Sequence, residues 1–416
     1  MSENIFCVEP DLEIPDYLTK EIGAKLAYAD ESVVSVEVAE GKGGISLVLK
    51  AEPDAEQAAA LESKVKHVVR SMAEGSFEPR LRVVEDNMDR PTAYDKNPME
   101  YLEPNREVVF EGPGYYALGP LLSGLIEFFE DRYKAVAVDM GARLYRFPAL
   151  ISPSYLEKVK YFENFPHSLS FVTHLREDID VIERFSREAC CEDGAVKTDD
   201  GAYARAQAML SPTVCHHLYM TLAGSTLPEE GIVATAYGNC FRYESSNMAS
   251  LERLWNFSMR EIIFVGDGDF VQEGLDRARG HMNAILDEMG LAYRIETATD
   301  PFFIGNYRDQ SAYQSAFELK FEVRMALPYK GDTLAAGSYN RHKDFFGRSL
   351  DIRLADGKAA ETGCVGFGVE RLAFAFIAQH GPEVKNWPAP VRQNMETSTA
   401  KWHSKKMPDF QGPPKY

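Results

Sequence analysis

The sequence predicts an α+β fold, in which a largely antiparallel β-sheet is flanked by helices and preceded by a small α/β module. Three observations lead to this prediction. Strand-like segments follow one another at irregular spacing with few helices between them, which favours antiparallel pairing. Of the 416 residues, 45% are hydrophobic, which allows one large core and a smaller one. A turn-rich, charged stretch after about residue 90 separates the two parts.

The small module is expected over residues 1–90 and the connector over residues 91–112. Residues 33–41 and 44–52 alternate like two strands joined across a GKG turn. Residues 55–75 have the periodicity of a helix, and RLRVVED at 80–86 is predicted to close the module as a strand. The module is therefore predicted as an appended α/β unit.

The large domain is expected over residues 113–382 and begins with a long helix from Pro120 to Gly141. RLYRFPALIS follows as a short edge strand, because Pro148 and Pro153 belong at the edge or end of a strand, and we expect a dimer contact here. Further strands are predicted at 231–244, 255–266, 292–300, 316–328 and 349–355, and helices at 269–290 and 367–380. Residues 383–416 contain prolines and lack periodicity, so an extended or disordered tail is expected.

Charge and apolar patterning argue against several functional classes. With 45 basic and 64 acidic residues the formal net charge is -19, which disfavours a broad electrostatic grip on nucleic acid. No apolar run reaches membrane-spanning length, and the first residues lack the features of a signal peptide, so we expect a cytoplasmic protein. The six cysteines do not suit a disulfide framework, and thiols or metal ligands are expected instead.

One predicted pair of strands carries residues that suit a nucleotide. Arg242 and Glu244 lie two apart in FRYE, hence on one face of a strand, and Phe257 and Glu261 alternate on the returning strand. Arginine can neutralise a phosphate and phenylalanine can stack on a base. From these residues alone, an exposed Arg–Glu pair beside a core phenylalanine is the stronger reading.

GFGVER places Arg371 in the first turn of an apolar helix, behind two glycines. The segment matches neither the Walker spacing nor the dinucleotide fingerprint, but a guanidinium is rarely buried without an anionic partner. Arg371 is therefore expected to meet a carboxylate or a bound phosphate. Cys215 and Cys364 lie far apart with no Cys-x-x-Cys pair, so local spacing favours two buried thiols over a zinc site.

Taken together, residues 110–380 resemble the catalytic core of class II aminoacyl-tRNA synthetases. The helix and edge strand over 120–148 resemble the first motif of that family, FRYE with the strand of Phe257 the second, and GFGVER the third, in the family's order. The resemblance implies the antiparallel class II sheet flanked by helices, ATP as substrate, and a homodimer formed through residues 120–148.

The resemblance is closer to zinc-dependent, methanogen-type seryl-tRNA synthetases and to amino acid:[carrier protein] ligases. It rests on RFP, LSPTVC, FRYE, SMRE, DPFF, LKFE, SYNRHKDFFG and TGCVGFGVERLA. By this resemblance Cys215, Glu261 and Cys364 form a zinc site, one per subunit. Three protein ligands leave a fourth position open, which is typical of catalytic zinc and would take the neutral amino group of the substrate.

In these families the carboxylate of an amino acid attacks the α-phosphorus of ATP to form an aminoacyl adenylate. The resemblance implies that Arg242 stabilises charge on the α-phosphate and that Phe257 stacks on adenine. It implies that Arg371 covers the other face of adenine or reaches the terminal phosphate, and that Glu244 contacts adenine or the substrate side.

Magnesium is implied on the phosphates of ATP. Ser338 and Asn340 of LAAGSYN match the serine-rich turn of the family, but this segment lacks the glutamate that precedes the turn in ordinary seryl enzymes. Glu322 of LKFEV could supply that carboxylate.

Features that the sequence lacks indicate which molecule accepts the activated amino acid. The seryl enzymes carry a dedicated N-terminal tRNA-binding domain, whereas residues 1–90 predict neither a long helical arm nor a basic surface. We therefore expect transfer of glycine, alanine or serine to the thiol of a phosphopantetheinylated carrier protein. The alternatives are seryl-tRNA synthetase-type aminoacylation of tRNA and a non-catalytic synthetase paralogue, although the motif arginines and all three implied zinc ligands are present.

Overall fold

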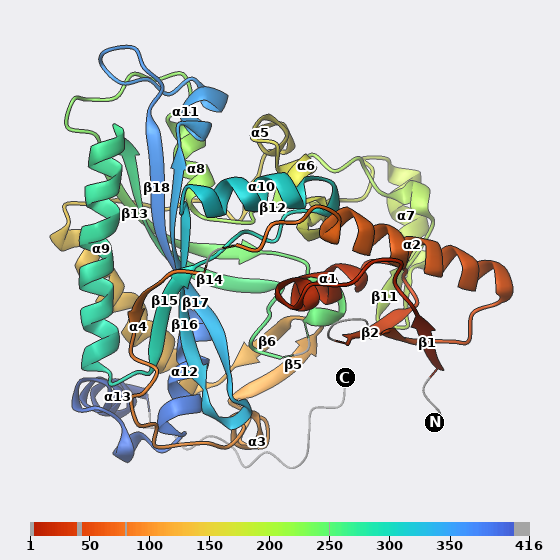
Figure 1. The fold of residues 1–416 in the computed structure, drawn as a ribbon, viewed down its shortest axis with the longest axis horizontal. Coiled ribbons are helices and arrows are strands. Elements are labelled where there is room, and N and C mark those ends of the chain that lie inside the picture. Colours follow the sequence, from red (N-terminus) through yellow and green to blue (C-terminus); the bar gives the residue numbers. More distant parts are fainter. Residues whose placement is uncertain (1–3, 40–43, 80, 249, 403–416) are drawn as a thin grey trace.

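A large, mainly antiparallel sheet forms the centre of the protein (Figure 1). The computed structural model describes residues 4–39, 44–79, 81–248 and 250–402. The strands of this sheet, in spatial order, are β4 (Val83–Asp86), β15 (Tyr293–Thr297), β16 (Lys320–Leu327), β17 (Asp332–Lys343), β18 (Glu361–Gly368), β14 (Asn256–Gly266), β13 (Ile232–Phe241) and β7 (Arg143–Tyr145). All neighbours are antiparallel except β7, which runs parallel to β13 at one edge. The predicted α+β fold is confirmed.

The two faces of this sheet have different covers, because successive side chains on a strand point to opposite faces. On β14, Ile262 and Phe264 pack in the main core, whereas Ile263 and Val265 belong to a second cluster on the other face. The main core is covered by α4 (Pro120–Asp139), α9 (Gly268–Glu288), α12 (Val369–His380) and α13 (Ala389–Trp402). The second cluster is covered by α5 (Pro153–Lys158), α8 (Cys215–Thr221) and α11 (Phe345–Leu350).

The helix predicted from Pro120 is α4. Proline occupies its first position, where the missing N–H has no helical partner in any case. The helix ends at Asp139, and Gly141 then adopts a φ of +77°, a conformation that glycine tolerates without a Cβ clash.

The N-terminal module is a three-stranded antiparallel sheet with two helices, shown in red at the right of Figure 1. Its elements are β1 (Asn4–Val8), α1 (Thr19–Leu26), β2 (Val33–Val38), β3 (Ile45–Leu49) and α2 (Ala55–Ala73), with strand order β1-β3-β2. The predicted strands and the long helix are present, whereas β1 and α1 were not predicted. Residues 41–43, the expected turn, lie outside the described residues. Phe302 and Tyr307 of the large domain complete the core of the module.

Smaller elements complete the chain. They are α3 (Met99–Leu102), β5 (Val108–Gly112), β6 (Tyr115–Leu118), β8 (Leu150–Ile151), α6 (Tyr161–Asn164), β9 (Phe171–Val172), α7 (Ile179–Glu188), β10 (Cys190–Glu192), β11 (Ala195–Lys197), β12 (Ala208–Leu210) and α10 (Ile304–Ala316). Within the described ranges, no helix combines the length and apolar character needed to span a bilayer.

Two strand predictions need correction. The segment at 80–86 contains β4, which does not close the N-terminal module but pairs with β15 of the large sheet. Tyr293 Oη donates a hydrogen bond to Glu85 Oε1 at 3.0 Å, which ties this strand to the large domain. The strand predicted at 349–355 is absent, because α11 occupies its beginning and Asp351 then turns the chain with a φ of +56°.

The tail prediction is wrong for residues 389–402, which form α13. Val391 and Met395 from this helix are buried in the main core. The sulfur of Met395 lies 2.8 Å from the position that a Cβ would take at Gly124, so the absent side chain at Gly124 lets the two helices approach. Residues 403–416 of the predicted tail lie outside the described residues.

Candidate metal and nucleotide site

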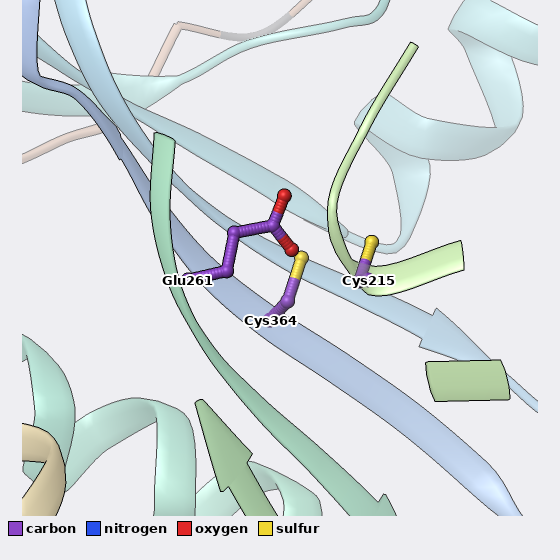
Figure 2. A group of neighbouring side chains, drawn as sticks. All are labelled: Cys215, Glu261 and Cys364. Carbon is purple, nitrogen blue, oxygen red and sulfur yellow. The ribbon is translucent and has the colours of Figure 1, made fainter. Parts of the chain in front are cut away.

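Three buried side chains converge on the sheet face beneath α8 (Figure 2). Cys364 on β18 pairs with Ile263 on β14, and Glu261 lies two residues before Ile263, so both point to the same face. Cys215 is the first residue of α8, which packs against this face. One donor atom from each residue lies within 4.8 Å of the others. Bonds of about 2.0–2.3 Å to a tetrahedral ion place its ligand atoms roughly 3.3–3.8 Å from one another, which lies within this limit.

The Glu261 carboxylate is held at one oxygen only. Its Oε1 accepts hydrogen bonds from Thr213 Oγ1 at 3.0 Å and from Val214 N at 3.1 Å. Its Oε2 is buried without a hydrogen-bond partner in the described part of the chain. Burial, together with the nearby Cys364, raises the pKa of Glu261 to about 8. A buried carboxylate with an unpartnered oxygen fits a site that takes a cation.

The two cysteine sulfurs occupy unequal environments. The neighbouring Cys215 thiol lowers the pKa of Cys364, whereas burial raises the pKa of Cys215. Asn340 Nδ2 points to Cys364 Sγ at 3.6 Å, and Thr213 Oγ1 lies 3.3 Å from Cys215 Sγ. A set of two thiols and one carboxylate suits a borderline-soft ion such as zinc.

The neighbouring β18 leaves room for this carboxylate. A Cβ at Gly366 would lie 2.6 Å from Met259 Cε and 3.4 Å from Glu261 Cγ. Gly366 also pairs with Glu261 across the sheet. The second glycine of the TGCVGFG run therefore provides space beside the candidate ligands, and this run is a buried strand that the sequence did not predict.

The predicted nucleotide residues lie next to this site, at the end of β13. Arg242 Nε donates to Pro212 O at 3.0 Å, and the guanidinium carbon lies 5.4 Å from the centroid of the Phe257 ring. This places Arg242 and Phe257 together, as expected. The strand ends at Phe241, so Arg242 and Glu244 follow the strand and do not share one of its faces.

Glu244 lies among arginines. It forms an ion pair with Arg253, a residue that sequence reasoning missed. Burial opposes the ionisation of Glu244, but Arg253 and Arg371 lower its pKa below the ordinary value. Arg371 Nη1 donates to Ala335 O at 3.2 Å; burial lowers the pKa of Arg371, and the Glu244 carboxylate opposes this shift. Arg371 therefore has a carboxylate among its neighbours, one of the two partners expected from sequence.

Ser338, Asn340 and Glu322 lie on adjacent strands of the same sheet. Asn340 Nδ2 donates to Ser338 Oγ at 3.0 Å, and Ser338 pairs with Glu322 in the register of β16 and β17. Glu322 is already engaged, because its two oxygens lie 3.2 Å from Lys320 Nζ and 3.2 Å from Arg324 Nη1. A magnesium ion on Glu322 would have to replace one of these cations.

Lys320 links this region to the segment before α10. Its Nζ lies 2.7 Å from Asp300 Oδ1, and Gln314 Nε2 donates to Asp300 Oδ2 at 2.7 Å. Burial opposes the ionisation of Asp300, but Lys320 lowers its pKa below the ordinary value. Neither residue was singled out from the sequence, although DPFF and LKFE contain them.

Comparisons with known proteins give a consistent set of relatives. The chain is 32% identical over 300 residues to amino acid--[acyl-carrier-protein] ligase 1 of Bradyrhizobium diazoefficiens, covering 71% of this chain and 89% of that protein. It is also 32% identical over 320 residues to ligase 2 of the same organism, covering 75% and 91%. The type-2 serine--tRNA ligase of Methanocaldococcus jannaschii is 23% identical over 327 residues, which cover 76% of this chain and 63% of the relative. No family model matches the chain.

Solved structures share the fold. M. kandleri SerRS, solved in complex with A. aeolicus tRNASec, aligns with a TM-score of 0.69 and 18% identity over 95% of this chain and 77% of that chain. The cytoplasmic serine-tRNA ligase of Naegleria fowleri in complex with AMP aligns with a TM-score of 0.55 and 14% identity, covering 82% and 78%. These likenesses show a class II synthetase fold.

Proposed function

Because the chain belongs to the family of amino acid:[acyl-carrier-protein] ligases, we propose that it activates a small amino acid with ATP and transfers it to a carrier-protein thiol. The amino acid carboxylate attacks the α-phosphorus of ATP, and pyrophosphate leaves. The phosphopantetheine thiolate then attacks the carbonyl carbon of the adenylate, and AMP leaves as the thioester forms. Glycine, alanine and serine are the proposed substrates.

The observation that carries the proposal is the convergence of Cys215, Glu261 and Cys364 beside Arg242 and Phe257. The donor set and the unpartnered Oε2 of Glu261 fit one zinc ion per chain. When bound, zinc supplies an open coordination position for a neutral amino group.

The remaining site residues have roles around ATP in this proposal. Arg242 neutralises charge on the α-phosphate, and Phe257 provides a stacking surface for adenine. Arg371 reaches the adenine or the terminal phosphate, and Glu244 contacts adenine or the substrate side. Ser338 and Asn340 support the sheet beside Cys364, and magnesium accompanies the phosphates with Glu322 as a candidate ligand.

Carrier protein is preferred over tRNA as the acceptor for two reasons. The chain has higher identity to the carrier-protein ligases than to the type-2 serine--tRNA ligases, and it covers more of their length. Its formal net charge of -19 also opposes broad binding to a polyanion. Aminoacylation of tRNA remains the second candidate, because M. kandleri SerRS in its tRNA complex aligns with 95% of this chain.

A homodimer through α4 and β7 is part of the proposal. The parallel strand β7 lies at the edge of the large sheet, and no strand among the described residues pairs with its outer side, so this edge can meet a second copy. Two apolar side chains beside this edge, Val138 and Leu144, are 60% and 58% exposed. Apolar residues at an open sheet edge are typical of an interface.

The proposed activation step is tested by ATP–pyrophosphate exchange with zinc-replete protein across the small amino acids. We expect exchange that depends on glycine, alanine or serine and is lost in Cys215→Ala. Exchange that depends on none of the amino acids would contradict the proposal and favour the non-catalytic paralogue.

A further inference from the structure

The C-terminal end of α1, in the N-terminal module, contacts the loop between β13 and β14. The described residues of this loop, 242–248 and 250–255, are called the nucleotide loop here because they include Glu244 and Arg253. Ser245 Oγ donates to Ala27 O at 3.2 Å, and Asn247 Nδ2 lies 3.5 Å from Ala24 O. The last carbonyls of a helix have no partner within it, so these side chains satisfy groups that would otherwise need water.

A third contact joins the same two segments at the backbone. Tyr28, two residues beyond α1, donates its hydroxyl hydrogen to Tyr243 O at 3.0 Å. Two residues later, Ser245 adopts a φ of +53°, in the left-handed region that side chains other than glycine rarely adopt. Such a conformation costs energy and persists where surrounding contacts hold it. The N-terminal module supplies these contacts.

Lys25 brings a positive charge from α1 to the same place. It is only 4% exposed, and its Nζ donates to Pro301 O at 2.8 Å and lies 3.2 Å from His167 Nε2. Burial lowers the pKa of His167 to about 4, so the neutral ring can accept from the ammonium. Burial lowers the pKa of Lys25 to about 8, and the carboxylates of Glu21 and Glu244 oppose this shift, so the ammonium form predominates at pH 7. Lysine is rarely buried this deeply unless its ammonium group has specific partners.

We propose that Lys25 is a positioning residue of the nucleotide site and that the N-terminal module holds the nucleotide loop in its ATP-binding conformation. This inference rests on the proposed function in one respect, namely that ATP binds between Arg242, Glu244 and Arg371. Lys25 fixes Pro301, which follows Asp300, and it lies on α1 between Ala24 and Ala27, whose carbonyls contact Asn247 and Ser245 of the nucleotide loop.

The physical reason is preorganisation. With α1 in place, the loop has its strained residue and its carboxylate already arranged, so ATP does not have to order them on binding. Without the Lys25 ammonium, Pro301 O and His167 lose their donor. The nucleotide should then bind more weakly, while the buried metal ligands on β14 and β18 remain in place.

The test compares Lys25→Met and Tyr28→Phe with Lys20→Met in the full-length, zinc-replete protein. Lys20 is a matched control, because it lies on the same helix but is exposed, and its ion pair in the described part of the chain is a 3.5 Å contact with Asp332 Oδ2. Equilibrium dialysis with labelled ATP gives the Kd of each variant directly. We expect Kd to rise about tenfold for Lys25→Met and about threefold for Tyr28→Phe, and to stay unchanged for Lys20→Met.

Exchange kinetics separate positioning from general damage. A positioning role raises KM for ATP in Lys25→Met and leaves KM for the amino acid and the zinc content unchanged. Should Lys25→Met fail to fold, Tyr28→Phe carries the test, because it removes a single hydroxyl. An unchanged ATP Kd in the soluble variants, or an equal loss in Lys20→Met, would overturn the inference. Wild-type protein that binds no ATP would overturn the proposed function and this inference together.

Discussion

Thr213, which lies two residues before Cys215 in the chain, donates a hydrogen bond from its Oγ1 to Glu261 Oε1 at 3.0 Å. One segment thus contributes a candidate metal ligand and also orients another. With Oε1 engaged by Thr213 and by Val214 N, Oε2 is the carboxylate oxygen left for an ion. Such supporting contacts fix the direction of a ligand and tune metal affinity.

Thr213→Val, which removes this hydroxyl at nearly constant volume, is expected to weaken zinc binding by about 10- to 100-fold. Competition with a coloured chelator measures the affinity. Thr235→Val is a comparison variant, because Thr235 Oγ1 accepts from Arg260 Nη1 and donates to the backbone carbonyl of Glu261 rather than to its carboxylate. Equal zinc affinity in wild type and Thr213→Val would show that the hydroxyl does not support a metal ligand.

Replacing a proposed ligand should remove the metal itself. Cys215→Ser, Cys364→Ser and Glu261→Gln are each expected to purify with far less zinc than the wild type, which should carry about one ion per chain. Elemental analysis of dialysed protein gives the ratio. Cys240→Ala, at a buried cysteine of β13 outside the cluster, should keep its zinc. Full zinc content in all three ligand variants would exclude this site.

Arg242→Lys should slow amino acid activation without affecting the metal. Lysine keeps the charge but loses the planar guanidinium over Phe257 and its hydrogen bond to Pro212 O. We expect the exchange kcat to fall by about 10²- to 10³-fold, the usual loss when one transition-state donor is removed. A kcat within threefold of the wild type, at saturating substrates, would place the catalytic charge elsewhere.

Asp300 should make stability depend on pH in the acid range. Its pKa is lowered in the folded protein, so it binds fewer protons than in the unfolded chain and stabilises the fold above its unfolded pKa of about 3.9. That contribution is lost as pH falls through the folded pKa. Asp300→Asn should therefore unfold more easily at pH 7, by about 1–3 kcal/mol, because Lys320 loses an anionic partner. The difference should shrink toward pH 3.

Denaturant melts of both proteins between pH 3 and pH 7 measure this difference. Asp309→Asn is a suitable control, because Asp309 is exposed and its ion pair among the described residues is with its neighbour Arg308 at 3.1 Å. A constant difference between wild type and Asp300→Asn across the range would contradict an ionised native Asp300.

Leu144→Glu should disrupt the proposed dimer. The side chain is 58% exposed on the edge strand β7, so a carboxylate there costs little in a monomer but repels its copy across a twofold interface. Analytical ultracentrifugation should show a dimer for the wild type and a monomer for the variant. Val196→Glu, at a 62% exposed position in the β10–β11 hairpin, is the control. A wild-type monomer at working concentration would refute the interface.

Sequence patterns predicted the helices and strands whose own residues show strong periodicity. The helix from Pro120 and the strand that became β14 both carry strong periodicity, and both are present. In contrast, β17 and β18 contain glycine, serine and asparagine, which have low strand propensity, and they form because the sheet pairs them on both sides. The strand expected at 349–355 has the right alternation, but Asp351 turns the chain before it can pair.

The candidate metal site, likewise, could not be predicted from local sequence patterns. Local spacing between Cys215 and Cys364 carried no metal signal, and only the family resemblance brought them together with Glu261. Their proximity depends on the pairing of β14 with β18 and on the position of α8, which are non-local. Arg253 and Lys25 gave no sequence signal, because Arg253 reaches Glu244, and Lys25 reaches Pro301 and His167, through tertiary packing.

The acceptor assay tests the central claim most directly. The amino acid identified by exchange, carrying a label, is incubated with ATP, the protein, phosphopantetheinylated carrier protein, unmodified carrier protein and bulk tRNA in one reaction. We expect label on the phosphopantetheinylated carrier alone, in a bond cleaved by hydroxylamine. Label that precipitates with tRNA and is released by ribonuclease, with none on the carrier, would contradict it and make the protein a tRNA synthetase.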